Sequence, residues 1–197
     1  RLSLSGGKDF FNVSPDISTY GKIYGGGLPL GLVAGTDAVM NCIRAKNPVF
    51  LGGTFSANPL SLAAGATALS ILKSKPEIYE NLDNAGGEIA DELNDFCLGK
   101  GIDGKVSRCS SMFRFIFTSK TVTDRRSRDT LEASEVVQHG FYSTLQENGL
   151  STGTNRINFL STSHDASVLE SVIVSFKKTI EKVLLTPRKK RLGAVSA

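Results

Sequence analysis

The most regular hydrophobic pattern of the chain lies between residues 76 and 98. Apolar side chains recur there every three or four residues and so share one face of a helix; they are Ile78, Leu82, Ala85, Ile89, Leu93 and Phe96. The segment Ser74-Lys75-Pro76-Glu77 just before them has capping-box spacing, with proline in the first turn. The pattern predicts an amphipathic helix that begins near Pro76 and ends near Leu98.

Shorter patterns predict the remaining elements. The predicted strands are 30–35, which reads as buried, 106–110, 112–117 and 157–160. The predicted helices are 37–44, 59–73, 131–147 and 165–184. The helix from Pro59 is rich in alanine and glycine, so it can approach a neighbouring segment or a ligand closely.

The two parts of the chain differ in glycine content and in the elements that they predict. Glycines are concentrated before residue 66, among apolar residues that argue against a flexible linker. Strands and helices of an α+β type follow the long helix. We therefore place a domain boundary at the start of that helix, with residues 1–76 in one domain and residues 77–197 in the other.

Composition excludes several classes of protein. The chain has 197 residues, of which 40% are hydrophobic and 21% charged, enough to bury a core. No apolar run approaches the roughly 18 residues of a membrane-spanning helix, so no membrane association is expected. The start at Arg1, with neither an initiator methionine nor a signal-peptide stretch, suggests a piece of a longer chain.

The net charge of +4 is concentrated at one end. Arg188, Lys189, Lys190 and Arg191 account for it, and the remaining body is neutral. We interpret this tail as a solvated chain end rather than a site for RNA or a membrane surface, and expect no nucleic-acid partner.

Cysteine and histidine indicate neither a disulfide framework nor a metal site. The three cysteines are odd in number and lack CxxC spacing, which favours free thiols in a reducing compartment, the cytoplasm. His139 and His164 have no Cys or His partner at ligand spacing, so no metal is expected.

One lysine stands in an unusual setting. Lys22 lies between Gly21 and the triplet Gly25 to Gly27, just ahead of the predicted strand 30–35. Desolvation disfavours the charged form of a lysine and frees its amine as a nucleophile, which can form Schiff bases with carbonyl compounds. The alternative is an ordinary solvated loop lysine.

A second feature follows at the start of the predicted helix 59–73. The segment Gly52-Gly53-Thr54-Phe55-Ser56-Ala57-Asn58-Pro59 is a small, hydroxyl-rich turn into a helix N-terminus. Backbone amides and the Thr54 hydroxyl would suit a phosphate dianion there. Alternatively, Ser56 or Asn58 is simply the N-cap of the helix.

Together these segments resemble the class-III, fold-type-I, pyridoxal-phosphate-dependent aminotransferases, a family that includes glutamate-1-semialdehyde aminomutase. The matching stretches are PDISTYGKIYGGGLPLGLVAGTDAVM and GGTFSANPLSLAAGATAL, with weaker similarity in SMFRFIFT and NRINFLSTSHDASVLESVI. The resemblance spans nearly the whole chain but only the C-terminal part of a family member. It implies an α/β fold, in which residues 1–76 are the latter part of the large cofactor domain and residues 77–197 are the small α+β domain.

The resemblance also implies roles for particular residues. Lys22 would be the Schiff-base lysine, and it would carry the proton between the substrate Cα and the cofactor. Thr54 would bind the phosphate of pyridoxal 5'-phosphate across the interface of a homodimer. The partners would then be a small-molecule amino donor and a keto or aldehyde acceptor. Family members place an acid, a stacking aromatic and a further phosphate loop before the lysine, so this chain should need residues from elsewhere to complete the pocket.

Some assignments stay open at this point. Arg156 falls where many relatives bind the substrate carboxylate, but a domain-interface salt bridge fits it equally well. Asp16 and Tyr20 are assigned to structure. The alternatives to an aminotransferase are a glutamate-1-semialdehyde-type aminomutase and a non-catalytic truncated subunit with a role in assembly.

Overall fold

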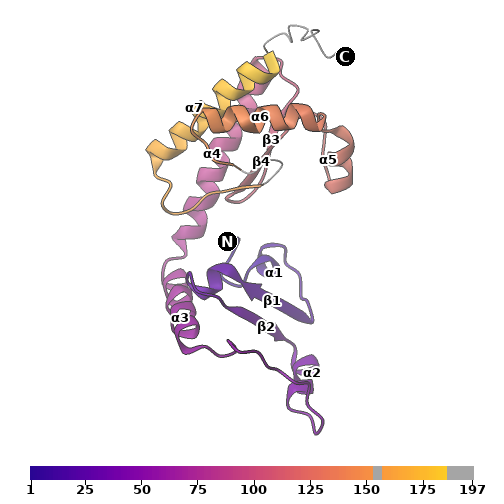
Figure 1. The fold of residues 1–197 in the computed structure, drawn as a ribbon, viewed down its shortest axis with the longest axis vertical. Helices are drawn as coiled ribbons and strands as arrows, with labels where there is room; N and C mark the ends of the chain where they lie inside the picture. The colour runs from indigo at the N-terminus through magenta and orange to yellow at the C-terminus, as the bar shows by residue number, and fades with distance from the viewer. Residues whose placement is uncertain (153–156, 186–197) are drawn as a thin grey trace, which may run out of the picture. The chain divides into compact units, whose positions relative to one another are not determined.

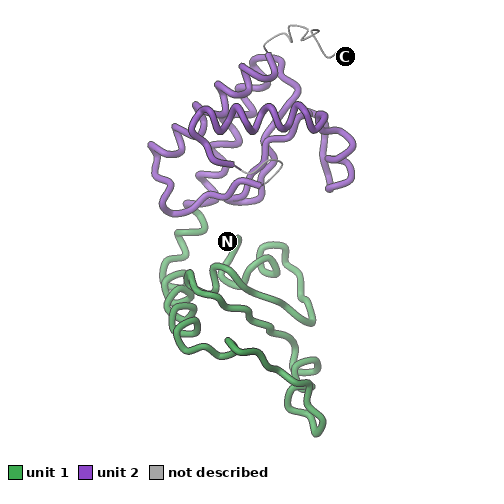
Figure 2. The backbone as a smooth tube through the Cα atoms, in the orientation of Figure 1, with its two compact units in different colours: residues 1–80 green, residues 81–197 purple. Residues whose placement is uncertain are grey.

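The computed structural model describes residues 1–152 and 157–185 (Figure 1). The chain divides into two compact units, residues 1–80 and residues 81–197 (Figure 2). The division falls inside the first turns of the long helix, and the sequence predicts a domain boundary at the start of that helix, near Pro76. Among the described residues, no helix has the length and apolar character needed to cross a membrane.

The first unit combines a two-stranded sheet with short helices and one long helix. Its elements are α1 (Gly7–Phe10), β1 (Ile17–Gly21), η1 (Lys22–Gly25), β2 (Gly31–Gly35), α2 (Asp37–Met40), η2 (Asn41–Ile43) and α3 (Pro59–Ser74). β1 and β2 are antiparallel, with Ile17 opposite Gly35 and Gly21 opposite Gly31. These bounds confirm the strand predicted at 30–35 and the helix predicted at 59–73, whereas the helix predicted at 37–44 is the short helix α2 followed by the 3-10 turn η2.

The predicted burial of the strand at 30–35 is wrong for this chain. Val33 of β2 is 62% exposed, and Ile17 on β1 is 51% exposed. β2 pairs with β1 alone in the described residues, and a two-stranded sheet has few neighbours against which to bury its side chains. The apolar side chains of β2 are therefore not buried within the described residues.

The long helix α4 (Glu77–Gly99) confirms the amphipathic pattern, with Ile89, Leu93 and Cys97 buried along one face. The expected N-capping role of Ser74 is wrong. The Ser74 hydroxyl donates to the Ile71 carbonyl oxygen over 3.0 Å, so it belongs to the last turn of α3. A serine hydroxyl that bonds back to its own helix is no longer available to cap the next one.

The second unit contains a three-stranded antiparallel sheet. Its strands are β3 (Lys105–Cys109), β4 (Met112–Ile116) and β5 (Asn158–Phe159), in the order β3-β4-β5. Within the hairpin, Val106 lies opposite Phe115 and Cys109 opposite Met112. The strands predicted at 106–110, 112–117 and 157–160 are confirmed with slightly shorter bounds.

Helices cover one face of this sheet. Side chains of Val106, Phe113 and Phe115 join the core formed with α4, α6 (Glu135–Glu147) and α7 (Ala166–Ile180). The Phe115 and Phe141 rings stack with centroids 5.0 Å apart. A π-helical turn, η3 (Glu181–Leu185), follows α7, and Asp165 caps α7 through the Val168 amide.

The helix predicted at 131–147 is α6, which begins only at Glu135, and Leu131 instead ends a separate helix, α5 (Arg125–Leu131), that the sequence did not predict. This separate helix begins at Asp124, which forms a capping box with Ser127. Glu132 then adopts an extended backbone, with φ −67° and ψ 155°, and ends the helix before α6 begins at Glu135. The apolar pattern runs across this break, so periodicity joined α6 to the end of α5.

Candidate functional site

Lys22 occupies a strained backbone position between two elements. It directly follows β1 and is the first residue of η1, with φ at 57°. The left-handed region costs a residue with a Cβ atom about 1 kcal/mol or more, and such strain persists where the surrounding structure enforces it. The turn therefore fixes the direction in which the lysine leaves the sheet.

Close backbone packing holds this turn against α3. A Cβ atom at Gly26 would lie 2.5 Å from the Ala64 carbonyl oxygen, and one at Gly65 would lie 2.5 Å from the Tyr24 carbonyl oxygen. Glycine on both sides is what permits this approach. The small residues of α3 thus allow η1 to pack directly on the helix, as the sequence of that helix predicted.

The lysine itself is not enclosed by the described residues. The Lys22 side chain is exposed, and its Nζ makes no hydrogen bond or ion pair with any residue that the structure describes. Of the two alternatives left open by the sequence, the described residues therefore match the solvated loop lysine. Its neighbours Gly25 and Tyr24 are more buried, because they face α3.

Thr54 lies in the turn that leads into α3. It is exposed, and its hydroxyl makes no hydrogen bond with another described residue. Asn58 is the N-cap of α3, because its Oδ1 accepts hydrogen bonds from the Leu60 and Ser61 amides, each over 3.1 Å. These amides are thereby occupied, so a phosphate here would depend on the Thr54 hydroxyl and the preceding loop.

No hydrogen bond joins Lys22 to Thr54. The Asp16 carbonyl oxygen accepts a hydrogen bond from the Thr36 amide over 3.0 Å, and the Tyr20 ring packs on Tyr24 with centroids 4.8 Å apart. The ring contact agrees with a structural role for Tyr20, whereas the Asp16 contact is made by its main chain, so the role of its carboxylate stays a prediction. Arg156 and the basic tail at 188–191 lie outside the described residues.

The sequence profile of the family described as aminotransferase class-III matches residues 5–163, most of the chain. The chain belongs to this family. A glutamate-1-semialdehyde 2,1-aminomutase from Thermosipho africanus is 33% identical over 189 residues, which cover 93% of the chain and 43% of that relative. A second such aminomutase, from Hydrogenobaculum sp., is 32% identical over 92% of the chain and 43% of the relative. This class-III chain thus spans less than half the length of these relatives.

Solved structures agree on the fold of this class-III chain. An omega-transaminase from Sphaerobacter thermophilus superposes with a TM-score of 0.82 at 24% identity, covering 92% of this chain and 42% of that one. A glutamate-1-semialdehyde aminomutase from Pseudomonas aeruginosa PAO1, in complex with PMP, gives a TM-score of 0.80 at 16% identity, with coverage of 93% and 42%. The class-III chain therefore has the fold-type-I α/β architecture that the sequence predicted.

Sequence reasoning missed a group of arginines in the second unit of the class-III chain. Arg114 interrupts the otherwise apolar strand β4, and Arg125 and Arg128 belong to α5, which was not predicted. A charged residue inside a buried strand is a detectable signal, because it requires a partner. That partner is Glu132, beyond the end of α5.

Proposed function

We propose that the chain is the lysine-bearing part of a pyridoxal-phosphate-dependent aminotransferase that moves an amino group from a donor to a carbonyl acceptor. The observation that carries the proposal is the strained Lys22 turn, held on α3 by glycine contacts, in a chain of the class-III family. A residue in strained backbone that packing enforces is typical of a functional site.

The residues of the first unit fit this cofactor. An aldehyde needs an accessible amine, and the Lys22 side chain is exposed with no internal partner among the described residues. A phosphate needs donors, and the Thr54 hydroxyl is likewise exposed and unoccupied. When bound, pyridoxal phosphate supplies an electron-withdrawing ring that stabilises negative charge at the substrate Cα.

The proposal gives Lys22 two tasks and Thr54 one. Lys22 would hold the cofactor through its ε-amine. Once a donor amine had displaced it, the same amine would be placed to move a proton at the substrate Cα and at the aldehyde carbon of the cofactor, as a general base and acid. Thr54 anchors the phosphate of the cofactor bound to a second subunit, which makes the active enzyme a homodimer. The three free cysteines favour a cytoplasmic setting.

The test is amino transfer by the complete enzyme that contains this chain, supplied with pyridoxal phosphate, an amine donor and a keto acid. We expect turnover that Lys22→Ala abolishes and that Lys46→Ala leaves intact, since Lys46 is an exposed lysine of the same unit. Retained turnover in Lys22→Ala would contradict the role of the lysine. No turnover in either the parent protein or the control would favour the non-catalytic, assembly role.

A second candidate is a 2,1-aminomutase, which is favoured by the two aminomutases that match the chain at 33% and 32% identity. Such an enzyme moves the amino group within one substrate, so it needs no separate keto acid. Incubation of the loaded enzyme with the donor alone separates the two. An aminotransferase releases one keto product per bound cofactor and stops, whereas an aminomutase continues to form the isomeric amine.

A further inference from the structure

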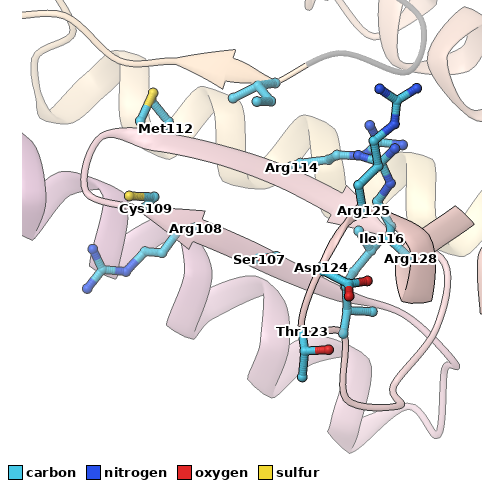
Figure 3. A pocket seen from close by; sticks show the side chains of 12 residues that line it. Ser107, Arg108, Cys109, Met112, Arg114, Ile116, Thr123, Asp124, Arg125 and Arg128 are labelled. Atoms are coloured by element: carbon cyan, nitrogen blue, oxygen red, sulfur yellow. The ribbon is translucent and has the colours of Figure 1, made fainter. Parts of the chain in front are cut away.

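The sheet of the second unit has one face that the core helices do not cover. Phe113 and Phe115 of β4 point into the core, and the alternating residues Met112, Arg114 and Ile116 lie on the other face. A cavity of about 310 Å³ opens over this second face (Figure 3). Its volume is at the lower end of the range for small-molecule sites.

Arginine dominates the charge of this cavity. Four arginines line it, Arg108, Arg114, Arg125 and Arg128, against a single carboxylate, that of Asp124. Arg114, Arg125 and Arg128 lie close together, while Arg108 lies apart from them (Figure 3). The Asp124 Oδ1 already accepts the Ser127 amide over 2.7 Å as part of the cap of α5. Arginine is therefore the main charged group that faces the cavity, although each of the four also pairs with a carboxylate outside the lining, Arg108 with Asp83 over 2.8 Å.

Carboxylates outside the lining pair with all four of these arginines, and those around Arg114 and Arg128 hold the two guanidinium groups most closely. Glu132 accepts two hydrogen bonds from Arg114 Nη2, over 3.1 and 2.8 Å, and both side chains are at least nine-tenths buried, at 9% and 4% exposure. Glu132 also lies 3.5 Å from Arg128 Nε, and Asp129 accepts from the same nitrogen over 3.0 Å. Neither Glu132 nor Asp129 lines the cavity. The guanidinium groups are thus oriented before any ligand arrives.

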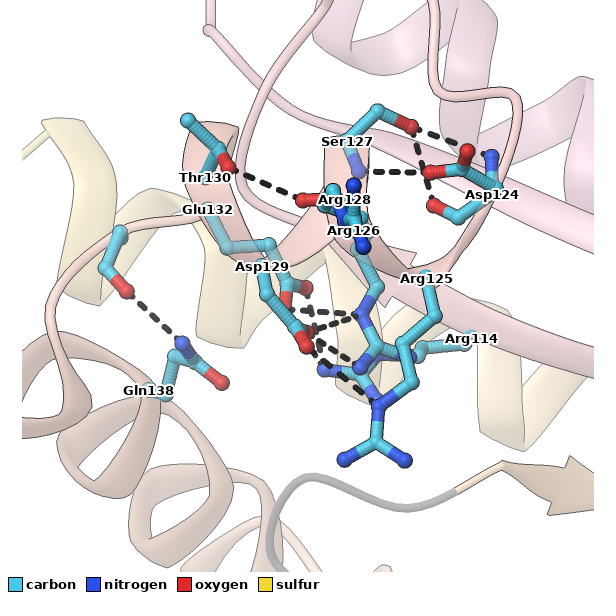
Figure 4. A network of polar contacts seen from close by, with 11 residues as sticks. Arg114, Asp124, Arg125, Arg126, Ser127, Arg128, Asp129, Thr130, Glu132 and Gln138 are labelled. Carbon is cyan, nitrogen blue, oxygen red and sulfur yellow. Dashed lines mark hydrogen bonds and ion pairs between the residues drawn. The ribbon is translucent and has the colours of Figure 1, made fainter.

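Arg125 offers its donors outward. Its Nε lies 3.4 Å from Asp129 Oδ2, and its side chain is 87% exposed. The two terminal nitrogens extend away from the network in Figure 4, and no hydrogen bond to another described residue occupies them. A guanidinium with both terminal nitrogens available matches a carboxylate in a two-point contact.

From this arrangement we propose that the cavity binds the carboxylate of a small organic anion, with Arg125 and Arg128 as the recognising residues and the buried Arg114–Glu132 pair as the support that orients Arg128. Met112, Val122 and Ile157 supply apolar lining for a carbon chain attached to that carboxylate. This lining favours an aliphatic carboxylate over inorganic phosphate. The site lies within the second unit and does not depend on the chemistry of Lys22.

The experiment is a titration of the 197-residue chain with hexanoate, followed by the NMR signals of the arginine Nε–Hε groups. Inorganic phosphate and sodium chloride are titrated in parallel at equal ionic strength. We expect saturable binding of hexanoate that shifts the Arg125 and Arg128 signals, weaker binding of phosphate and none of chloride. Arg125→Gln should weaken hexanoate binding by about tenfold, because a charge-assisted two-point contact is lost.

Arg126→Gln is the matched control, since Arg126 carries the same charge in the same helix but does not line the cavity. It should bind hexanoate with unchanged affinity. Arg128→Gln removes a residue that also contacts Glu132, so its fold is checked by circular dichroism, and Arg125→Gln decides the question if that variant unfolds. The proposal is overturned by the absence of saturable hexanoate binding, by equal weakening in Arg126→Gln, or by tighter binding of phosphate than of hexanoate.

Discussion

Gly65 of α3 lies directly against the main chain of Tyr24 in η1. A Cβ atom at Gly65 would stand 2.5 Å from the Tyr24 carbonyl oxygen and 2.9 Å from the Leu30 Cδ2 atom. Because Lys22 belongs to the same short helix as Tyr24, this contact couples the position of the candidate catalytic amine to α3.

The first prediction concerns that contact. Gly65→Ala should loosen η1 from α3, because the new methyl group overlaps backbone rather than a movable side chain. We expect an overpacking cost of about 1–3 kcal/mol against a gain in helix propensity of about 1 kcal/mol. Hydrogen exchange of the α3 amides measures the effect and should become faster. Gly31→Ala is the control. A Cβ atom added at Gly31 would have no neighbouring heavy atom within 4 Å, so this substitution should leave the protection of the α3 amides unchanged.

A second prediction compares two adjacent glycines of α4. A Cβ atom at Gly86 would overlap the carbonyl oxygen of Ser110, whereas one at Gly87 would meet only the tip of Arg108, 3.5 Å away. Gly86→Ala should therefore lower the melting temperature of the second unit. Gly87→Ala should raise it or leave it unchanged, since alanine is favoured over glycine in a helix. Similar effects of the two substitutions in thermal melts would contradict the close packing of α4 on the β3–β4 turn.

The third prediction is a pH dependence at the start of α7. Hydrogen bonds from the Ser167 hydroxyl and then from the Val168 amide lower the pKa of the Asp165 carboxyl below its ordinary value of 3.8. A lowered pKa in the folded state stabilises the fold at pH values above that ordinary value, and this stabilisation is lost as the pH falls through the folded pKa. Asp165→Asn keeps a capping side chain but no longer titrates. Its melting temperature should approach that of the parent protein as the pH falls below 3.8. A constant difference across the pH range would refute the assignment.

Thiol reactivity provides the fourth prediction. Burial raises the pKa of Cys97 to about 11, and its side chain is 1% exposed within the core of the second unit. Because the thiolate is the reactive form, Cys97 should resist maleimide at pH 8 until the protein unfolds. Cys42 is exposed and should react in the folded protein. Mass spectrometry of the labelled peptides distinguishes the two thiols. Rapid labelling of Cys97 under native conditions would contradict its burial in the core of the second unit.

The sequence predicted those features that depend on local pattern. The apolar periodicity of α4, the strands β3 and β4 and the family of the chain all follow from residues near one another in the sequence. The break at Glu132 depends instead on a partner in β4, because the carboxylate pairs with Arg114, and periodicity does not report such a contact. The capping of α3 by Asn58 was one of two alternatives, and only the hydrogen-bond geometry decides between them.

The exposure of the Lys22 side chain is a further feature that the structure decides. Glycine and apolar neighbours in the sequence indicate close packing, but burial depends on what packs against the turn from elsewhere. Within the first unit, the packing on α3 buries Gly25 and leaves the lysine side chain open. Local sequence therefore indicates close backbone packing around the lysine and leaves the solvation of its side chain open.

The central claim is that the Lys22 amine bonds to the aldehyde of pyridoxal phosphate. The most direct test is borohydride reduction of the complete enzyme that contains this chain, after incubation with one equivalent of the cofactor, followed by peptide mapping, with Lys22→Arg and Lys46→Arg in parallel. The account predicts a reduced adduct on Lys22 that persists in Lys46→Arg and disappears in Lys22→Arg. An adduct on another side chain, or no adduct on the parent protein, would contradict it.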